Sequence, residues 1–135
     1  MDVEKIQAAL RKQTRGLATG QLCANSKGER FFGCALGVLF HAAGKRRRDI
    51  ETEEMANYGF MFDGLLKEEY GLDTHEIDAV VSANDSFLAY CPANSGPKRL
   101  RDFMILWFAK FAQFRNKQAP AKANKLARKA VGCDF

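Results

Sequence analysis

Apolar residues recur at helical spacing between residues 33 and 44, and the rest of the chain is organised around this stretch. Positions three or four residues apart form one wide apolar stripe on a helix: Phe32, Leu36, Leu39, Phe40 and Ala43. Because the flanking positions are apolar too, the pattern predicts a helix that is buried nearly all round. Gly37 in its interior costs roughly 1 kcal/mol relative to Ala, which indicates that a neighbouring backbone or ring lies directly against it.

The residues before this helix predict a first helix and a small β-hairpin. Asp2 is a suitable N-cap for a helix that runs to about Gln13 and stops at Gly16. Residues 17–24 and 29–32 flank a cluster of turn-forming residues and are predicted to be the two strands of the hairpin. An isolated hairpin is marginal in water, so we expect it to pack on the helices.

The residues after the central helix predict further helices. Residues 52–57 favour a short acidic helix and residues 60–70 a second apolar one. Asp73 and Glu76 form a capping-box pattern for a helix that runs to about Asn84.

The longest predicted helix begins at Pro97, since proline suits the first turn of a helix, and it carries Trp107 within a broad apolar stripe. Pro120 breaks this pattern, and residues 121–130 predict a weakly amphipathic basic helix.

Together these elements predict a mainly α protein: a compact single-domain bundle of five to six helices with a small β-hairpin. Residues 1–117 are expected to form the globular domain, and residues 118–135 a basic C-terminal tail that is helical or frayed. A chain of 135 residues can bury one core without staples. No stretch approaches the roughly 18 consecutive apolar residues of a membrane span, and the N-terminus lacks the apolar core of a signal peptide, so a cytoplasmic location is expected.

The net charge of +5 hides a strong segregation along the chain. Residues 1–48 carry ten Lys or Arg against three Asp or Glu, residues 49–90 one against eleven, and residues 91–135 ten against two. These blocks either compensate one another in the fold or present a basic face to nucleic acid or an acidic protein. The candidate binding residues form two basic groups: Lys45, Arg46, Arg47 and Arg48, and Lys98, Arg99 and Arg101.

The four cysteines are scattered and form no C-x-x-C pair: Cys23, Cys34, Cys91 and Cys133. Without a secretory signal, this spacing favours four separate thiols in a reducing compartment over a disulfide framework. Two distant histidines and unclustered cysteines argue against a metal site, and no cofactor motif is present.

Cys34 and His41 are the candidate nucleophile and base, because seven residues place them on one face of the central helix. Seven residues also span roughly 10 Å of helix axis, whereas such a pair needs a separation of roughly 3 Å. The sequence therefore predicts a core thiol at Cys34, which His75 reaches only through the tertiary fold, and no catalytic constellation.

Asn84, Asp85 and Ser86 close a predicted helix and open a loop. Local turn chemistry explains these residue types, since their side chains bond the neighbouring backbone. The alternatives are a buried Asn–Asp pair that anchors the hairpin or Arg15, and a catalytic carboxylate at Asp85.

Four short segments resemble a pattern found in small uncharacterised bacteriophage and prophage proteins. These are Gln13-Thr14-Arg15-Gly16-Leu17, Cys34-Ala35-Leu36-Gly37-Val38-Leu39, Tyr70-Gly71-Leu72 and Asn84-Asp85. The resemblance covers roughly residues 5–90 and implies a phage or prophage origin, a small and mostly helical fold, and structural motif positions at Arg15, Gly16, Cys34, Gly37, Asn84 and Asp85. It brings no catalytic role. Phe87 fits the pattern, but the basic, aromatic helix that follows departs from it.

The predicted function is that of a non-enzymatic phage-type accessory protein, cytoplasmic in a bacterial host. It is expected to bind a host protein or complex and to inhibit host defence or regulation, an expectation that rests on the resemblance. The alternative is nucleic-acid binding through the basic groups. The acidic segment 49–78 and the two basic groups are the alternative interfaces. No membrane or cofactor partner is expected, and the oligomeric state stays open.

Overall fold

The computed structural model describes residues 1–24, 30–55, 63–91, 96–114 and 119–133, with the backbone alone for residues 52–55 and 63. Seven helices and no strand occur within these ranges. They are α1 (Val3–Arg11), α2 (Ala35–Ala42), α3 (Arg47–Met55), α4 (Asp63–Tyr70), α5 (Thr74–Tyr90), α6 (Pro97–Gln113) and α7 (Ala119–Ala130). The mainly α class is confirmed, with more helices than the five or six predicted.

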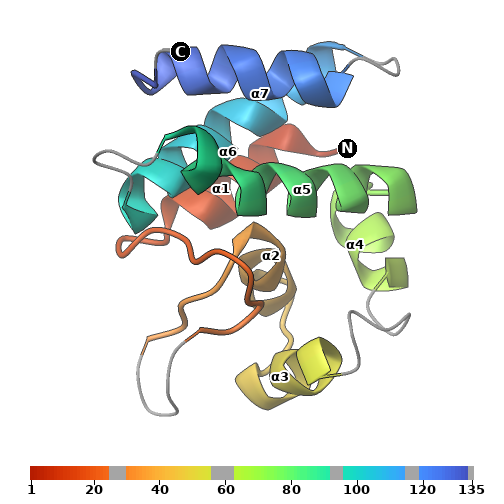
Figure 1. Cartoon of the computed structure of the whole chain (residues 1–135). Helices are drawn as coiled ribbons and strands as arrows, with labels where there is room; N and C mark the ends of the chain where they lie inside the picture. The colour runs from red at the N-terminus through yellow and green to blue at the C-terminus, as the bar shows by residue number, and fades with distance from the viewer. Residues whose placement is uncertain (25–29, 56–62, 92–95, 115–118, 134–135) are drawn as a thin grey trace.

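The helices form a stack with α7 at one end and α3 at the other (Figure 1). Helix α7 lies across α6, α6 packs against α1, and α1 and α5 both pack against α2. The predicted central helix is confirmed as α2, whose residues 35–40 are all buried. None of the helices in the described ranges combines the length and apolar content needed to cross a bilayer.

The predicted helix caps are confirmed at two N-termini. The Asp2 carboxylate accepts a hydrogen bond from the Lys5 N–H at 3.1 Å. Asp73 and Glu76 form a reciprocal capping box, with distances of 2.8 and 3.0 Å.

Two of the predicted helices begin at other residues. The acidic helix predicted at 52–57 begins earlier, as α3 at Arg47. The apolar helix predicted at 60–70 is observed as α4 from Asp63 onward, and residues 60–62 lie outside the described ranges.

The predicted β-hairpin is wrong for the described part of residues 17–24 and 30–32, which contains no strand. Three backbone hydrogen bonds join the two sides: Ala18 N–H to Gly33, Ala24 N–H to Phe32, and Cys34 N–H to Gln21. A regular ladder does not form because Gly20 adopts a positive φ of 71° and because α5 side chains bind backbone groups of this segment. The predicted turn at 25–28 lies outside the described residues.

Gly37 confirms the expectation of a close backbone neighbour. A Cβ atom at this position would overlap the carbonyl of Leu22, and the same carbonyl lies over Gly33. The 17–24 segment therefore crosses directly over the N-terminal turn of α2.

The predicted basic tail forms α7, which packs on α6 through small side chains at Ala119, Ala123 and Ala127. The buried Trp107 indole N–H donates to Asn124 Oδ1 at 2.7 Å and so links the two helices. Pro120 lies in the first turn of α7, where proline is tolerated.

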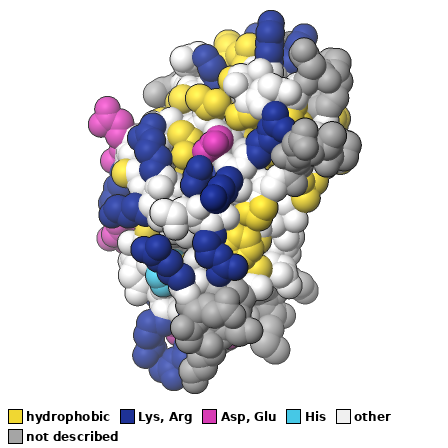
Figure 2. All heavy atoms as spheres, turned by 90° about the vertical axis from the view of Figure 1, so that its left-hand side faces the viewer, with side chains coloured by type: hydrophobic (Ala, Val, Ile, Leu, Met, Phe, Trp, Pro, Cys, Tyr) yellow, Lys and Arg dark blue, Asp and Glu magenta, His cyan; other side chains and the backbone are white. Residues whose placement is uncertain are grey.

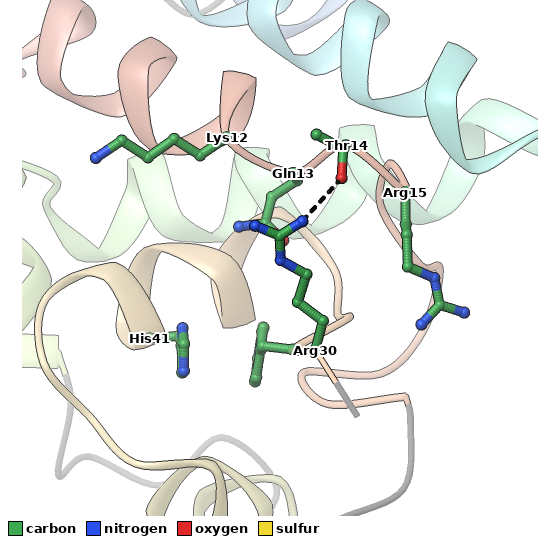
Figure 3. A pocket seen from close by; sticks show the side chains of 7 residues that line it. Lys12, Gln13, Thr14, Arg15, Arg30 and His41 are labelled. Carbon is green, nitrogen blue, oxygen red and sulfur yellow. Dashed lines mark hydrogen bonds between the residues drawn. The ribbon is translucent and has the colours of Figure 1, made fainter. Parts of the chain in front are cut away.

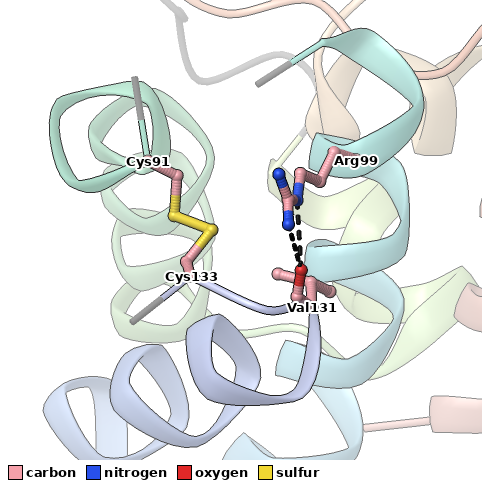
Figure 4. The surroundings of a disulfide bond; sticks show 4 residues. All are labelled: Cys91, Arg99, Val131 and Cys133. Atoms are coloured by element: carbon pink, nitrogen blue, oxygen red, sulfur yellow. Dashed lines mark hydrogen bonds between the residues drawn. A yellow bond between two sulfur atoms is a disulfide. The ribbon is translucent and has the colours of Figure 1, made fainter. Parts of the chain in front are cut away.

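The structure contains a disulfide between Cys91 and Cys133 (Figure 4), which corrects the prediction of four separate thiols. It joins the C-terminal end of α5 to the residues after α7, two points separated by 42 residues in the sequence. Arg99 donates two hydrogen bonds to the Val131 carbonyl beside it, at 2.6 and 3.1 Å. The spacing of the cysteines in the sequence does not predict this disulfide, because the two cysteines are brought together only by the packing of α7. Cys23 and Cys34 are buried and not disulfide-bonded.

Candidate functional site

A cavity of about 170 Å³ opens between the end of α1, the residues before α2, and the last turn of α2 (Figure 3). We call it the basic pocket, and it is lined by Lys12, Gln13, Thr14, Arg15, Arg30, Phe31 and His41. All the charged side chains in this lining are basic. The Arg30 guanidinium donates to the Thr14 hydroxyl at 3.4 Å, which holds it across the pocket.

An aromatic pair forms one wall of the basic pocket. The His41 and Phe31 rings are stacked, with centroids 4.3 Å apart and an interplanar angle of 9°. Phe31 is buried, whereas His41 is exposed. Loss of hydration lowers the pKa of His41, and the positive charge of Arg47 lowers it further. The imidazole is therefore mainly neutral at pH 7, as its ordinary pKa is already about 6.5.

The turn after α1 is fixed by contacts with the start of α6. Gly16 has a φ of 91°, and a Cβ there would overlap the Pro97 carbonyl. The Leu17 N–H donates to that carbonyl at 2.9 Å, and Arg101 donates to the Gln13 carbonyl at 3.0 Å. These contacts hold the Lys12–Arg15 backbone in place at the rim of the pocket.

A second cavity, of about 330 Å³, lies along α1 and is also bordered by His41. We call it the α1 groove; it is lined by Lys5, Ala8, Ala9, Lys12, Gln13, His41, Ala42 and Tyr70. It shares Lys12, Gln13 and His41 with the basic pocket, so the two cavities adjoin. Lys5 bonds Glu69 at 2.8 Å at the far end.

Lys and Arg side chains are spread over one face of the molecule, with a histidine among them and few acidic side chains (Figure 2). From the first predicted basic group, Arg47 lies near Phe31, with its guanidinium 5.7 Å from the centre of that ring, but it is not part of the pocket lining. Arg47 also donates to Cys23 Sγ at 3.5 Å, and Arg46 pairs with Asp49 at 3.3 Å. Lys45 is partly buried and Arg48 exposed.

The second predicted basic group is used largely within the fold. Arg99 binds the Val131 carbonyl, and Arg101 binds the Gln13 carbonyl and the Asp102 carboxylate. Lys98 is exposed at the start of α6. Two of these three side chains therefore position backbone segments.

Asn84 and Asp85 connect the 17–24 segment to α5 and α2. The Asn84 amide accepts from the Ala35 N–H at 3.0 Å and donates to the Ala18 carbonyl at 2.9 Å. Asp85 accepts from the Gly20 N–H at 2.9 Å. The turn interpretation is thus wrong, since α5 continues through both residues to Tyr90. Asn84 is buried and anchors the 17–24 segment, but Asp85 is exposed, so the two residues do not form the buried pair of the alternative.

Of the other motif positions, Cys34 lies in the core and Arg15 lines the basic pocket. Cys34 is buried and caps α2, its sulfur accepting from the Gly37 N–H at 3.5 Å. Its predicted place in the core is confirmed. Arg15 lies 5.1 Å from the centre of the Phe32 ring and lines the basic pocket. His75 is exposed on α5.

Sequence reasoning missed the binding potential of Lys12, Arg30 and the stacked Phe31–His41 pair. No group of three or more metal-ligating side chains is found within the described residues. Comparison with protein-family models, curated proteins and solved structures finds no match for this chain.

Proposed function

We propose that this chain is a nucleic-acid-binding protein that contacts the phosphate backbone through the basic pocket and the face around it. The observation that carries the proposal is the presence of Lys12, Arg15 and Arg30 in the lining of one cavity that has no acidic side chain in its lining. Guanidinium groups match the geometry of phosphate oxygens and bind them in a bidentate manner. Neutralised phosphates release counterions, which favours binding of a polyanion.

The distribution of exposed apolar side chains favours nucleic acid over a protein partner at this face. Protein interfaces depend on buried aromatic or apolar anchors at their centre. The large apolar side chains exposed among the described residues are Leu88, Tyr90 and Leu126, which belong to α5 and α7 rather than to the pocket.

The acidic segment 49–78 supports the host-protein alternative less well. Several of its described carboxylates act within the fold: Asp49 pairs with Arg46, Glu69 with Lys5, and Asp73 caps α5. Binding and inhibition of a host complex stays a prediction from the phage-type resemblance.

The test is a salt titration of binding to labelled DNA and RNA, with the variant Lys12→Gln/Arg15→Gln/Arg30→Gln. Each lost phosphate contact lowers the slope of log K against log salt by about 0.7 for single strands and about 0.9 for duplex. We expect the triple variant to bind more weakly, with a slope reduced by about 2.

The matched control is Lys122→Gln/Lys125→Gln/Lys129→Gln, which removes the same charge from exposed positions of α7 at the other end of the stack. This control is expected to retain most of the wild-type slope of log K against log salt. Far-UV circular dichroism checks that both variants fold. Absence of binding at low salt, or an equal loss in the two variants, would contradict the proposal.

A further inference from the structure

We infer that the nucleic acid taken by this site is an unpaired strand, with one base stacked on the His41 ring. The inference rests on the proposed function and narrows its ligand. Three features carry it: the exposed stacked imidazole, the continuity of the two cavities past it, and the polar side chains beside it.

The His41 ring has the geometry of a stacking platform. Phe31 supports one face in a nearly parallel arrangement and is itself buried, so the pair is held in a fixed orientation. His41 is exposed and also lines the α1 groove, in whose lining Phe31 takes no part. Unstacked bases commonly bind on such rings, including histidine.

The two adjoining cavities both border this platform and carry basic side chains. Arg15 and Arg30 lie on the pocket side and Lys12 lies at the junction, while Lys5, at the far end of the α1 groove, is paired with Glu69. Lys5 lies on α1 and Lys12 is its C-cap residue, seven residues further on, which corresponds to roughly 10 Å along the helix axis. A positively charged groove that follows the backbone, combined with a ring on which a base stacks, is the usual means of binding single strands.

Gln13, which lines both cavities, and Thr14, which lines the basic pocket, provide hydrogen-bond donors and acceptors there. In a duplex, the Watson–Crick edges are occupied and the base faces are covered by their neighbours. A base therefore reaches His41 and these polar groups only when it is unpaired.

The test compares the full chain binding to three fluorescent probes: an oligothymidylate and an oligouridylate of about 12 nucleotides, within the typical site size, and a blunt DNA duplex of the same length. We expect both single strands, or one of them, to bind at least about tenfold more tightly than the duplex. His41→Ala should weaken single-strand binding roughly 5- to 100-fold and leave duplex binding nearly unchanged.

Two variants distinguish stacking from a general effect. His41→Phe keeps an aromatic face and should restore single-strand affinity, while His75→Ala changes the other histidine and should have no effect. Equal binding of single strand and duplex, or an unaltered affinity in His41→Ala, would overturn the inference. The proposed function would stand if the Lys12/Arg15/Arg30 variant still lost binding, whereas a failure to bind any of the probes would overturn both.

Discussion

At the scale of single residues, Asn84 is the buried polar side chain on which the positions of three segments depend. It is 1% exposed, and its amide is bonded to the backbone of Ala18 and of Ala35. Buried polar groups are costly when they lose a partner, because the remaining donor or acceptor stays desolvated. Asn84 therefore positions the chain on which the basic pocket is built.

Asn84→Ala is expected to lower the free energy of unfolding by about 3 kcal/mol, since it leaves two buried backbone groups without their partner at about 1–3 kcal/mol each. Urea denaturation measures this difference. Asp85→Asn is the matched control, because its amide oxygen still accepts from the exposed Gly20 N–H, and its cost should stay below about 1 kcal/mol. Equal costs for the two substitutions would show that the Asn84 bonds contribute little.

At the scale of elements, the contact between α2 and the 17–24 segment sets the shape of the site. Gly37→Ala improves helix propensity by up to about 1 kcal/mol, yet its Cβ would overlap the Leu22 carbonyl. We expect a net loss of stability of about 2 kcal/mol or more, as in other overpacked cores, seen as a lower Tm.

Gly64→Ala is the control for this substitution. Gly64 lies in α4 with open space around its Cα, so an added methyl group meets nothing within 4 Å. This variant should be stabilised by about 0.4–1 kcal/mol. A Gly37→Ala protein as stable as the wild type would mean that the segment moves away from α2 at little cost.

Elements with local signals were predictable from the sequence, whereas those set by distant contacts were not. The apolar stripe of α2, the Asp2 cap and the Asp73–Glu76 capping box each depend on residues within a turn or two of the chain. The hairpin prediction was wrong because α5 side chains bind the backbone of that segment, and no pattern within the segment itself indicates such distant contacts. The turn prediction at Asn84 was wrong for the same reason. Residues that favour turns can continue a helix when their side chains hydrogen-bond to groups distant in the sequence.

The site was predictable only in its charge. Clustered arginines identified Arg47, which lies near Phe31 but does not line the pocket. Lys12 and Arg30 are isolated in the sequence. They line the same pocket because the chain turns at Gly16 and the 17–24 segment crosses over α2. Arg99 and Arg101 are the opposite case. They are clustered in the sequence, but they bind backbone carbonyls within the fold and do not line the pocket.

At the scale of the whole molecule, the disulfide attaches an end of the stack that has little apolar surface of its own. The buried residues of α7 are three alanines, which bury little area. In the chain-entropy model, closing a loop of 42 residues lowers the conformational entropy of the unfolded chain and so raises the free energy of unfolding by about 4 kcal/mol. A reducing agent should therefore lower the Tm by roughly 10 °C.

The double variant Cys91→Ser/Cys133→Ser serves as the control for this measurement. Its Tm should match that of the reduced wild type and should not respond to the reducing agent. A wild-type Tm that is the same with and without reductant would show that the cross-link leaves the unfolded chain unrestricted.

The position of Trp107 also makes the molecule optically asymmetric. The chain contains one tryptophan, and its indole is bonded to Asn124 and stacked on Phe111 at the α6–α7 contact. Intrinsic fluorescence therefore reports on that end of the stack, while His41 lies in α2, away from α7. Emission moves to longer wavelength when water reaches the indole, so separation of α7 can be followed without a label.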